Sequence, residues 1–138
     1  MATDYQVKMS VCLRPINQPR VLIEIHGKRI DQTLTHTQEF DFDFVARDQS
    51  VFKVHHVGKL DSDPTTAVEI VSVSFFDITN PRFAWAGVYT PVYPPHWTGP
   101  SELPGQTYLG WNGEWALEFS VPVFSWMHQK LNLGWLYQ

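Results

Sequence analysis

Alternation of apolar and polar residues, one by one, is the feature that most limits how this chain can fold. Successive side chains of a strand point to opposite faces, so this pattern indicates strands with one buried face. Helical periodicity is nearly absent. The stretches that are alternating or rich in β-branched residues in the first half are 5–14, 21–26, 29–34, 40–44, 51–57 and 67–76. The sequence therefore predicts an all-β protein.

The number of these stretches, and the turn residues that separate them, predict how the strands are layered. The length of 138 residues suits one core, so we predict a single domain over residues 1–138. About eight to ten short strands separated by turn residues favour a two-sheet antiparallel sandwich, and in particular a jelly roll. Within it, residues 21–34 should form a tight hairpin at Gly27. We expect the last strand pair at Val123–Met127 and Leu133–Tyr137.

A second hairpin is predicted around Asn112-Gly113, a pair typical of two-residue turns. With the turn at this position, parity places Trp115 on the buried face. The same parity places Trp111 and Glu114 on the face toward solvent. We therefore expect Trp111 to be partly exposed and close to a carboxylate.

The preceding arm of this hairpin follows from the same parity argument. Tyr108 falls on the core face, and Leu109 falls on the solvent face. Gly110 lies opposite Trp115, so we expect the missing side chain of Gly110 to leave room for the indole.

A proline-rich and aromatic segment at about 78–105 interrupts the regular alternation. All six tryptophans lie between Trp85 and Trp135, and only four charged residues follow Phe83. Long loops in compact domains are usually functional or disordered, and aromatic density argues against disorder. A flat ring on a proline-stiffened loop can cover the apolar face of a sugar with little loss of entropy. The segment therefore predicts a rigid ligand-binding loop.

Six residues form the predicted ligand-binding set: Trp97, Trp111, Tyr93, Tyr89, His96 and Glu114. The rings would stack on a sugar, and the histidine and the carboxylate would bind its hydroxyl groups. Trp97 is expected at a loop tip, because proline and glycine flank it. Two alternatives stay open: the rings close over an end of the sandwich, or they anchor another protein, since Trp and Tyr also dominate protein interfaces.

Charge and composition narrow the range of partners. The net charge of −4 argues against nucleic acid, because phosphate binding requires a basic face. No apolar run is long enough to span a membrane. The first residues lack the features of a secretory signal, so we expect synthesis in the cytoplasm. Cys12, the single cysteine, cannot form an internal disulfide.

A glycan-degrading enzyme is a third alternative, and it would need two carboxylates across a cleft. Glu114 and Glu118 share one strand face, but four residues at 3.3 Å each separate them by roughly 13 Å. Glycosidase pairs are about 5 to 9.5 Å apart. A partner from another strand, such as Glu69, would be required. We therefore predict a protein that is not an enzyme.

Calcium is the cofactor that the sequence can accommodate, because it takes loop carboxylates, amides and carbonyls. The first candidate pair is Asp77 with Asn80, at the end of a strand. The second is Asp61 with Asp63, although Asp63 and the residues after it also suit a turn without metal. The histidines are isolated or adjacent on a strand, and they form no zinc motif.

Two resemblances accompany these patterns. Residues 21–80, with Ile-Glu-Ile-His-Gly-Lys and Val-Ser-Val-Ser-Phe-Phe-Asp-Ile-Thr-Asn, resemble small calcium-dependent xylan-binding modules. That resemblance implies a jelly roll that binds polysaccharide, with Asp77 at the position of a calcium ligand. The words Tyr-Leu-Gly-Trp-Asn-Gly and Leu-Gly-Trp-Leu-Tyr resemble small virion proteins of large tailed marine phages. The second resemblance implies a virion location, with host surface glycans or other virion proteins as partners.

The leading hypothesis is therefore a non-catalytic carbohydrate-binding protein carried on a phage particle. The runner-up is a structural virion or assembly protein that uses the same aromatic surface for protein contacts.

Overall fold

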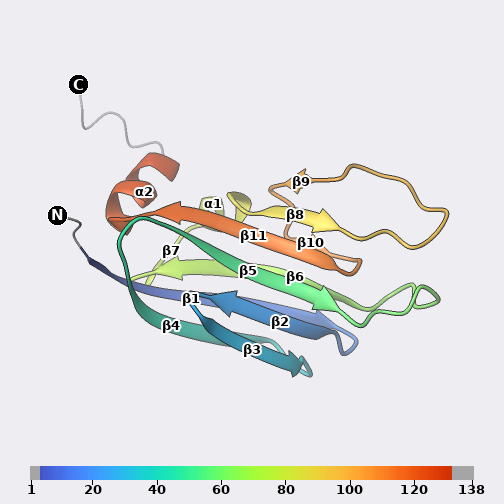
Figure 1. Cartoon of the computed structure of the whole chain (residues 1–138). Helices are drawn as coiled ribbons and strands as arrows, with labels where there is room; N and C mark the ends of the chain where they lie inside the picture. Colours follow the sequence, from blue (N-terminus) through green and yellow to red (C-terminus); the bar gives the residue numbers. More distant parts are fainter. Residues whose placement is uncertain (1–3, 132–138) are drawn as a thin grey trace.

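A computed structural model describes residues 4–131 as two antiparallel sheets packed face to face (Figure 1). Sheet A has the order β10-β6-β1-β4, with β7 also paired to β6. Its strands are β1 (Tyr5–Ile16), β4 (Gln38–Ala46), β6 (Ala67–Phe75), β7 (Ile78–Thr79) and β10 (Tyr108–Leu109). The predicted two-sheet antiparallel sandwich is confirmed.

Sheet B has the order β3-β2-β5-β11-β8-β9. Its strands are β2 (Arg20–Ile25), β3 (Lys28–Thr33), β5 (Gln49–Val57), β8 (Val88–Pro91), β9 (Leu103–Pro104) and β11 (Gly113–Ser120). The described residues also form two short helices, α1 (Pro81–Trp85) and α2 (Val123–Lys130). The described part of the chain contains no helix with the length and apolar character of a membrane span.

The core lies between the sheets and follows the alternation of the sequence. On β4, the Phe40, Phe42 and Phe44 side chains are buried while Asp41 and Asp43 point outward. Trp115 on β11 is completely buried, and its ring meets Phe52 edge to face at 6.1 Å between centroids. Period two therefore identified which side chains enter the core of these strands.

The first predicted hairpin is confirmed and the second is wrong. β2 pairs with β3 around Gly27, which has a φ of 82°. In contrast, β10 pairs with β6 in sheet A, while β11 pairs with β5 and β8 in sheet B. Asn112 and Gly113 therefore do not form a hairpin turn, because the chain crosses from one sheet to the other.

This crossing reverses the parity predicted for the residues before it. Leu109 is completely buried, whereas the Tyr108 side chain is 44% exposed. The prediction holds for Trp111 within the crossing, which is partly exposed, and for Trp115 beyond it, which is buried. The room for the Trp115 indole comes from Gly87 on the β8 side, where a Cβ would lie 2.2 Å from the ring. The prediction that Gly110 makes this room is therefore wrong.

Two further differences concern helices. The stretch Val123–Met127 was predicted as a strand, but it belongs to α2. Val123, Trp126 and Met127 are the buried residues of α2, and their spacing of three and four residues is helical. Its predicted partner strand, Leu133–Tyr137, lies outside the described residues.

The segment 78–105 is also more ordered than expected, because it contains β7, α1 and β8. Asn80 accepts a hydrogen bond from the backbone N of Arg82 at 2.9 Å, and Pro81 begins α1. A capping side chain followed by proline is the usual start of a helix. The longest run without helix or strand in this segment is residues 92–102, which β9 follows.

Candidate functional site

Three segments distant in sequence meet at one end of the sandwich (Figure 1). β5 and β8 end there, and they lead into the segments 58–66 and 92–102. The connection 110–112 between β10 and β11 lies at the same end, while α2 lies at the opposite end. The fold thus places the proline-rich segment beside the crossing between the sheets.

Trp97 and Trp111 form an aromatic pair at this end. Their ring centroids are 5.2 Å apart and their planes are inclined by 54°. Trp97 is 59% exposed, and Trp111 is half-buried. The two strongest sequence candidates therefore come together, and Trp97 presents most of the open aromatic surface.

A tight turn carries Trp97. The backbone N of Trp97 donates to the carbonyl of Pro94 at 3.1 Å. Pro95 occupies the second position, and His96 has a φ of 73° at the third position. Proline followed by a residue with positive φ is the pattern of a type II turn. The predicted loop tip is confirmed, and His96 is exposed beside Trp97.

The backbone of Trp111 is held by Tyr89. The Tyr89 hydroxyl donates to the Trp111 carbonyl, and it accepts from the Trp111 backbone N at 3.0 Å. Burial raises the pKa of Tyr89 to about 12, so the hydroxyl keeps the proton it donates. Because Tyr89 is only 1% exposed, its ring cannot stack on a ligand. Tyr89 is therefore a positioning residue rather than the ligand contact that we predicted.

Lys59 and Asn112 fix the other side of Trp111. The Asn112 side-chain oxygen accepts from the backbone N of Lys59, and the side-chain nitrogen donates to the Lys59 carbonyl, each at 2.8 Å. The Lys59 ammonium donates to the Gly110 carbonyl at 2.6 Å and lies 4.6 Å from the Trp111 ring centroid. Burial lowers the pKa of Lys59, while the charge of Asp63 opposes that effect. Sequence patterns gave no signal for Lys59, because its partners are about fifty residues away.

Tyr93 braces the loop that carries Trp97. Its hydroxyl donates to the Pro100 carbonyl at 2.9 Å, across the loop. A Cβ on Gly99 would lie 2.6 Å from that hydroxyl oxygen, so the ring packs directly on the glycine. Tyr93 is half-buried, and it connects the two arms of the loop.

An open groove of about 500 Å³ runs over sheet B at the same end of the sandwich. Its polar and apolar lining includes His55, Thr90, Val92, Asn112 and Glu114. Val92 begins the segment that carries Trp97, and Asn112 follows Trp111, so the groove and the aromatic pair lie at the same end of the sandwich. This end therefore combines an exposed ring with a groove that contains hydrogen-bonding groups, as binding of a molecule with polar edges and an apolar face requires.

The carboxylates of this face do not form a catalytic pair. Glu114 lies 3.6 Å from the Lys53 ammonium, and Glu118 accepts from Gln49 at 3.1 Å. Glu69, the suggested partner from another strand, pairs with Arg14 on the outer face of sheet A. Because Glu69 and Glu114 lie on opposite outer faces of the sandwich, they cannot flank one glycosidic bond.

Asp77 and Asn80, the first pair of calcium candidates, each have a separate local role. The Asn80 side-chain oxygen caps α1, as described above. Asp77 lies in the β6–β7 turn with a φ of 65°. In the other candidate loop, the Asp63 carboxylate accepts from the backbone N atoms of Thr65 and Thr66, each at 3.0 Å. These bonds, and one from the Thr66 hydroxyl, hold the pKa of Asp63 well below its usual range.

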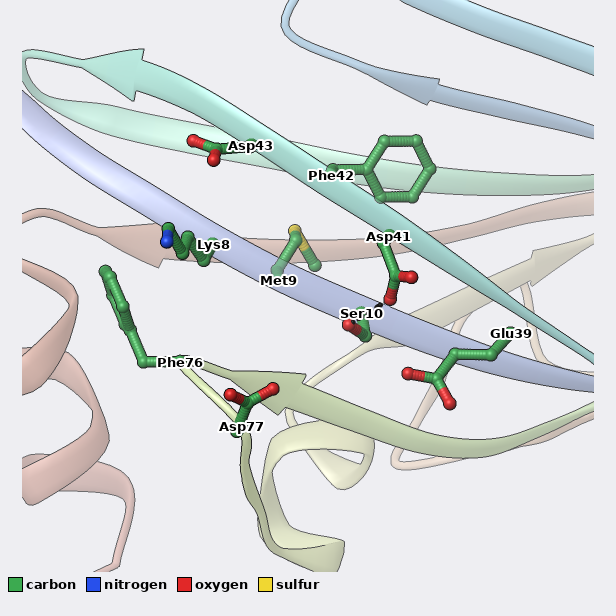
Figure 2. A pocket seen from close by; sticks show the side chains of 9 residues that line it. All are labelled: Lys8, Met9, Ser10, Glu39, Asp41, Phe42, Asp43, Phe76 and Asp77. Carbon is green, nitrogen blue, oxygen red and sulfur yellow. Dashed lines mark hydrogen bonds between the residues drawn. The ribbon is translucent and has the colours of Figure 1, made fainter.

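A depression of about 450 Å³ on sheet A gathers four carboxylates: Glu39, Asp41, Asp43 and Asp77 (Figure 2). Three of them alternate along β4, so neighbouring ones start roughly 6.6 Å apart along the strand. Asp41 also accepts from the Ser10 hydroxyl at 2.6 Å. No cluster of three or more His, Cys, Asp or Glu residues within residues 4–131 could hold a metal ion. The donors of this depression therefore do not fit a calcium site.

Comparison with known proteins identifies the fold. No family model matches the sequence, and no curated protein matches it. The solved structure of vCBM60 in complex with galactobiose aligns with a TM-score of 0.54 and 19% identity over 80% of this chain and 96% of that chain. The chain has the fold of vCBM60. A selenomethionine form of vCBM60, described as linking two families of calcium-dependent carbohydrate binding modules, gives 0.51 and 19% over 83% and 90%.

The likeness to vCBM60 agrees with the resemblance to calcium-dependent carbohydrate-binding modules found in the sequence. The resemblance to phage virion proteins stays a prediction.

Proposed function

We propose that this protein binds a glycan without cleaving it, and that Trp97 is the principal contact. The observation that carries the proposal is an exposed indole on a tight turn, packed against a second indole, at the end of the sandwich that also holds a groove of mixed polar and apolar lining. Tyr89, Asn112 and Lys59 hold the second indole, so little conformational entropy is lost when a ligand covers the pair. His96 and Glu114 would supply hydrogen-bonding groups for the polar edges of the sugar.

The comparison with vCBM60 supports this proposal and suggests a first probe. That protein has the same fold and was solved with galactobiose. Galactobiose and galactan are therefore tested first, followed by xylan because of the resemblance in residues 21–80. Attachment to a phage particle would make a host surface glycan the target.

We expect Trp97→Ala to weaken glycan binding about tenfold or more, because burying an aromatic ring stabilises a contact by about 1.5–3 kcal/mol. Calorimetry with galactobiose and retardation in gels containing galactan or xylan measure the change. Phe124→Ala is the matched control, since Phe124 is 57% exposed on α2 at the opposite end of the sandwich. It should bind like the wild type.

Equal binding by wild type and Trp97→Ala would remove the aromatic pair as the contact. The assembly alternative makes a different prediction for the same variant. If light scattering shows an oligomer that Trp97→Ala dissociates, and no glycan is retained, the exposed ring anchors protein rather than sugar.

Calcium removal is expected to leave glycan binding unchanged. The modules described for vCBM60 are calcium-dependent. In this protein, however, three of the four carboxylates of the depression in Figure 2 alternate along β4, and the Asp63 carboxylate accepts the hydrogen bonds of its own turn. Calcium ligands lie 2.3–2.6 Å from the ion, which places opposite oxygens only about 5 Å apart. Gel retardation in EDTA, compared with added calcium, measures the dependence. Loss in EDTA with recovery in calcium would show that the protein assembles a calcium site.

A further inference from the structure

A second hollow lies on sheet A beside α1, and it shares no lining residue with the groove on sheet B. Its volume is about 190 Å³. The side chains that matter here are Glu69, Val71, Ser72, Thr79, Trp85 and Thr107. We call it the α1 hollow.

Interrupted strand pairing creates the α1 hollow. On this side of β6, within the described residues, β10 pairs with Val68 and Glu69, and β7 pairs with Ser74 and Phe75. The register with β1 shifts near Val71, which leaves this residue 48% exposed in a bulge. Ile70 is still bonded here, because its backbone N donates to the Thr107 carbonyl at 2.8 Å. The stretch from Val71 to β7 is open on this side within the described residues, and α1 flanks it. Bulges of this kind occur frequently beside functional sites.

A fixed backbone presents the Trp85 ring at this hollow. Phe83, two residues earlier, is completely buried and meets Phe75 edge to face at 5.7 Å. The backbone after the helix is held too, since Gly87 N donates to the Ala84 carbonyl at 3.1 Å. The Trp85 side chain is nevertheless 58% exposed. An indole that is open to solvent on a fixed backbone is pre-organised for stacking.

Polar groups that suit sugar hydroxyls line the α1 hollow together with Trp85. Ser72 and Thr107 each offer a hydroxyl, which can both donate and accept, and the Thr79 hydroxyl, which already bonds the Ser74 hydroxyl at 2.5 Å, keeps part of that capacity. The Glu69 carboxylate uses Oε2 in its 2.6 Å contact with Arg14. Carboxylates form strong hydrogen bonds with hydroxyl donors. An indole, three hydroxyls and a carboxylate therefore line one small hollow.

We propose that the α1 hollow is a second glycan-binding site, which takes one pyranose residue stacked on Trp85. Pockets for drug-sized ligands measure about 300–1,000 Å³, so this smaller hollow suits a single sugar residue. The inference rests on the proposed function for the kind of ligand, but it involves separate residues. Two sites on one domain would let a single polysaccharide, or two neighbouring chains, engage both and gain avidity.

Indole NMR signals test the two sites independently. The six tryptophans give six side-chain N–H signals when labelled with ¹⁵N, and single Trp→Phe variants assign them. Galactobiose, xylobiose and cellobiose are titrated separately to high concentration. We expect one of them to shift the Trp85 signal as well as the signals of Trp97 and Trp111.

The outcomes separate the two proposals. Shifts at Trp97 and Trp111 without Trp85 would overturn the second site and retain the proposed function. Shifts at Trp85 alone would retain the second site and remove the aromatic pair. If no sugar shifts any of the three, both proposals fail.

A polymer measurement tests the avidity. We expect Trp85→Ala to reduce retention in galactan or xylan gels about tenfold, while the Trp97 signal still responds to the disaccharide with unchanged affinity. Glu69→Gln, which keeps the side-chain volume, should weaken the Trp85 response. Phe124→Ala again serves as the matched control. Wild-type retention by Trp85→Ala would overturn the second site.

Discussion

Replacing Gly113 with alanine is expected to destabilise the protein by about 4 kcal/mol, as backbone strain and a steric clash act together. Gly113 has a φ of 153°, a conformation that residues with a side chain rarely adopt. An added Cβ would lie 2.4 Å from the carbonyl oxygen of Thr90 and 2.8 Å from Cα of Pro91. Both are backbone atoms of a paired strand, so neither can rotate away. β5 on the other side of β11 prevents a compensating shift.

Gly110→Ala is the matched control for this substitution. Gly110 lies in the same connection, but the nearest atom to its added Cβ is Cε1 of Tyr108 at 3.2 Å. The Tyr108 side chain is exposed and can move, so we expect a change within about 1 kcal/mol. Urea unfolding followed by circular dichroism measures both variants. Similar midpoints for Gly113→Ala and wild type would show that the crossing does not need glycine.

Gly87→Ala is expected to cost about 3 kcal/mol, because it overfills the centre of the core. The added Cβ would lie 2.2–2.4 Å from Cε2, Cζ2 and Nε1 of Trp115. Trp115 is completely buried and meets Phe52, so the indole has no free space to enter. The loss should appear as a lower unfolding midpoint together with a changed near-ultraviolet spectrum of the tryptophans.

A double-mutant cycle with Trp115→Phe tests whether the clash with the indole causes the loss of stability. Trp115→Phe removes Nε1 and Cζ2 and makes the ring smaller, so adding Gly87→Ala should destabilise by less than it does in the wild type. Residues in contact commonly show coupling energies of about 0.5–3 kcal/mol in such cycles. Additive effects of the two substitutions would mean that the clash is relieved elsewhere.

The candidate site was predictable in its parts but not in its assembly. Trp97 stood out on a proline-rich backbone and Trp111 through the parity of the predicted hairpin, and the structure places the two ring centroids 5.2 Å apart. Tyr89 carried the same signal, yet it is buried and bonds the backbone of Trp111. Aromatic residues are equally suited to cores and to ligands, so composition cannot separate the two roles. Lys59 was missed because its role depends on contacts with Gly110 and Asn112.

The sequence alone determined the β class, the buried face of strands such as β4, and the hairpin at Gly27. Those features are local: period two sets the face of each side chain, and a turn residue permits a tight reversal. The tertiary structure decided which strands pair. Asn112-Gly113 suits a hairpin, but β10 joins sheet A and β11 joins sheet B. Burial of Leu109 and Trp115 between the sheets requires that crossing, and no local pattern encodes a contact between distant strands.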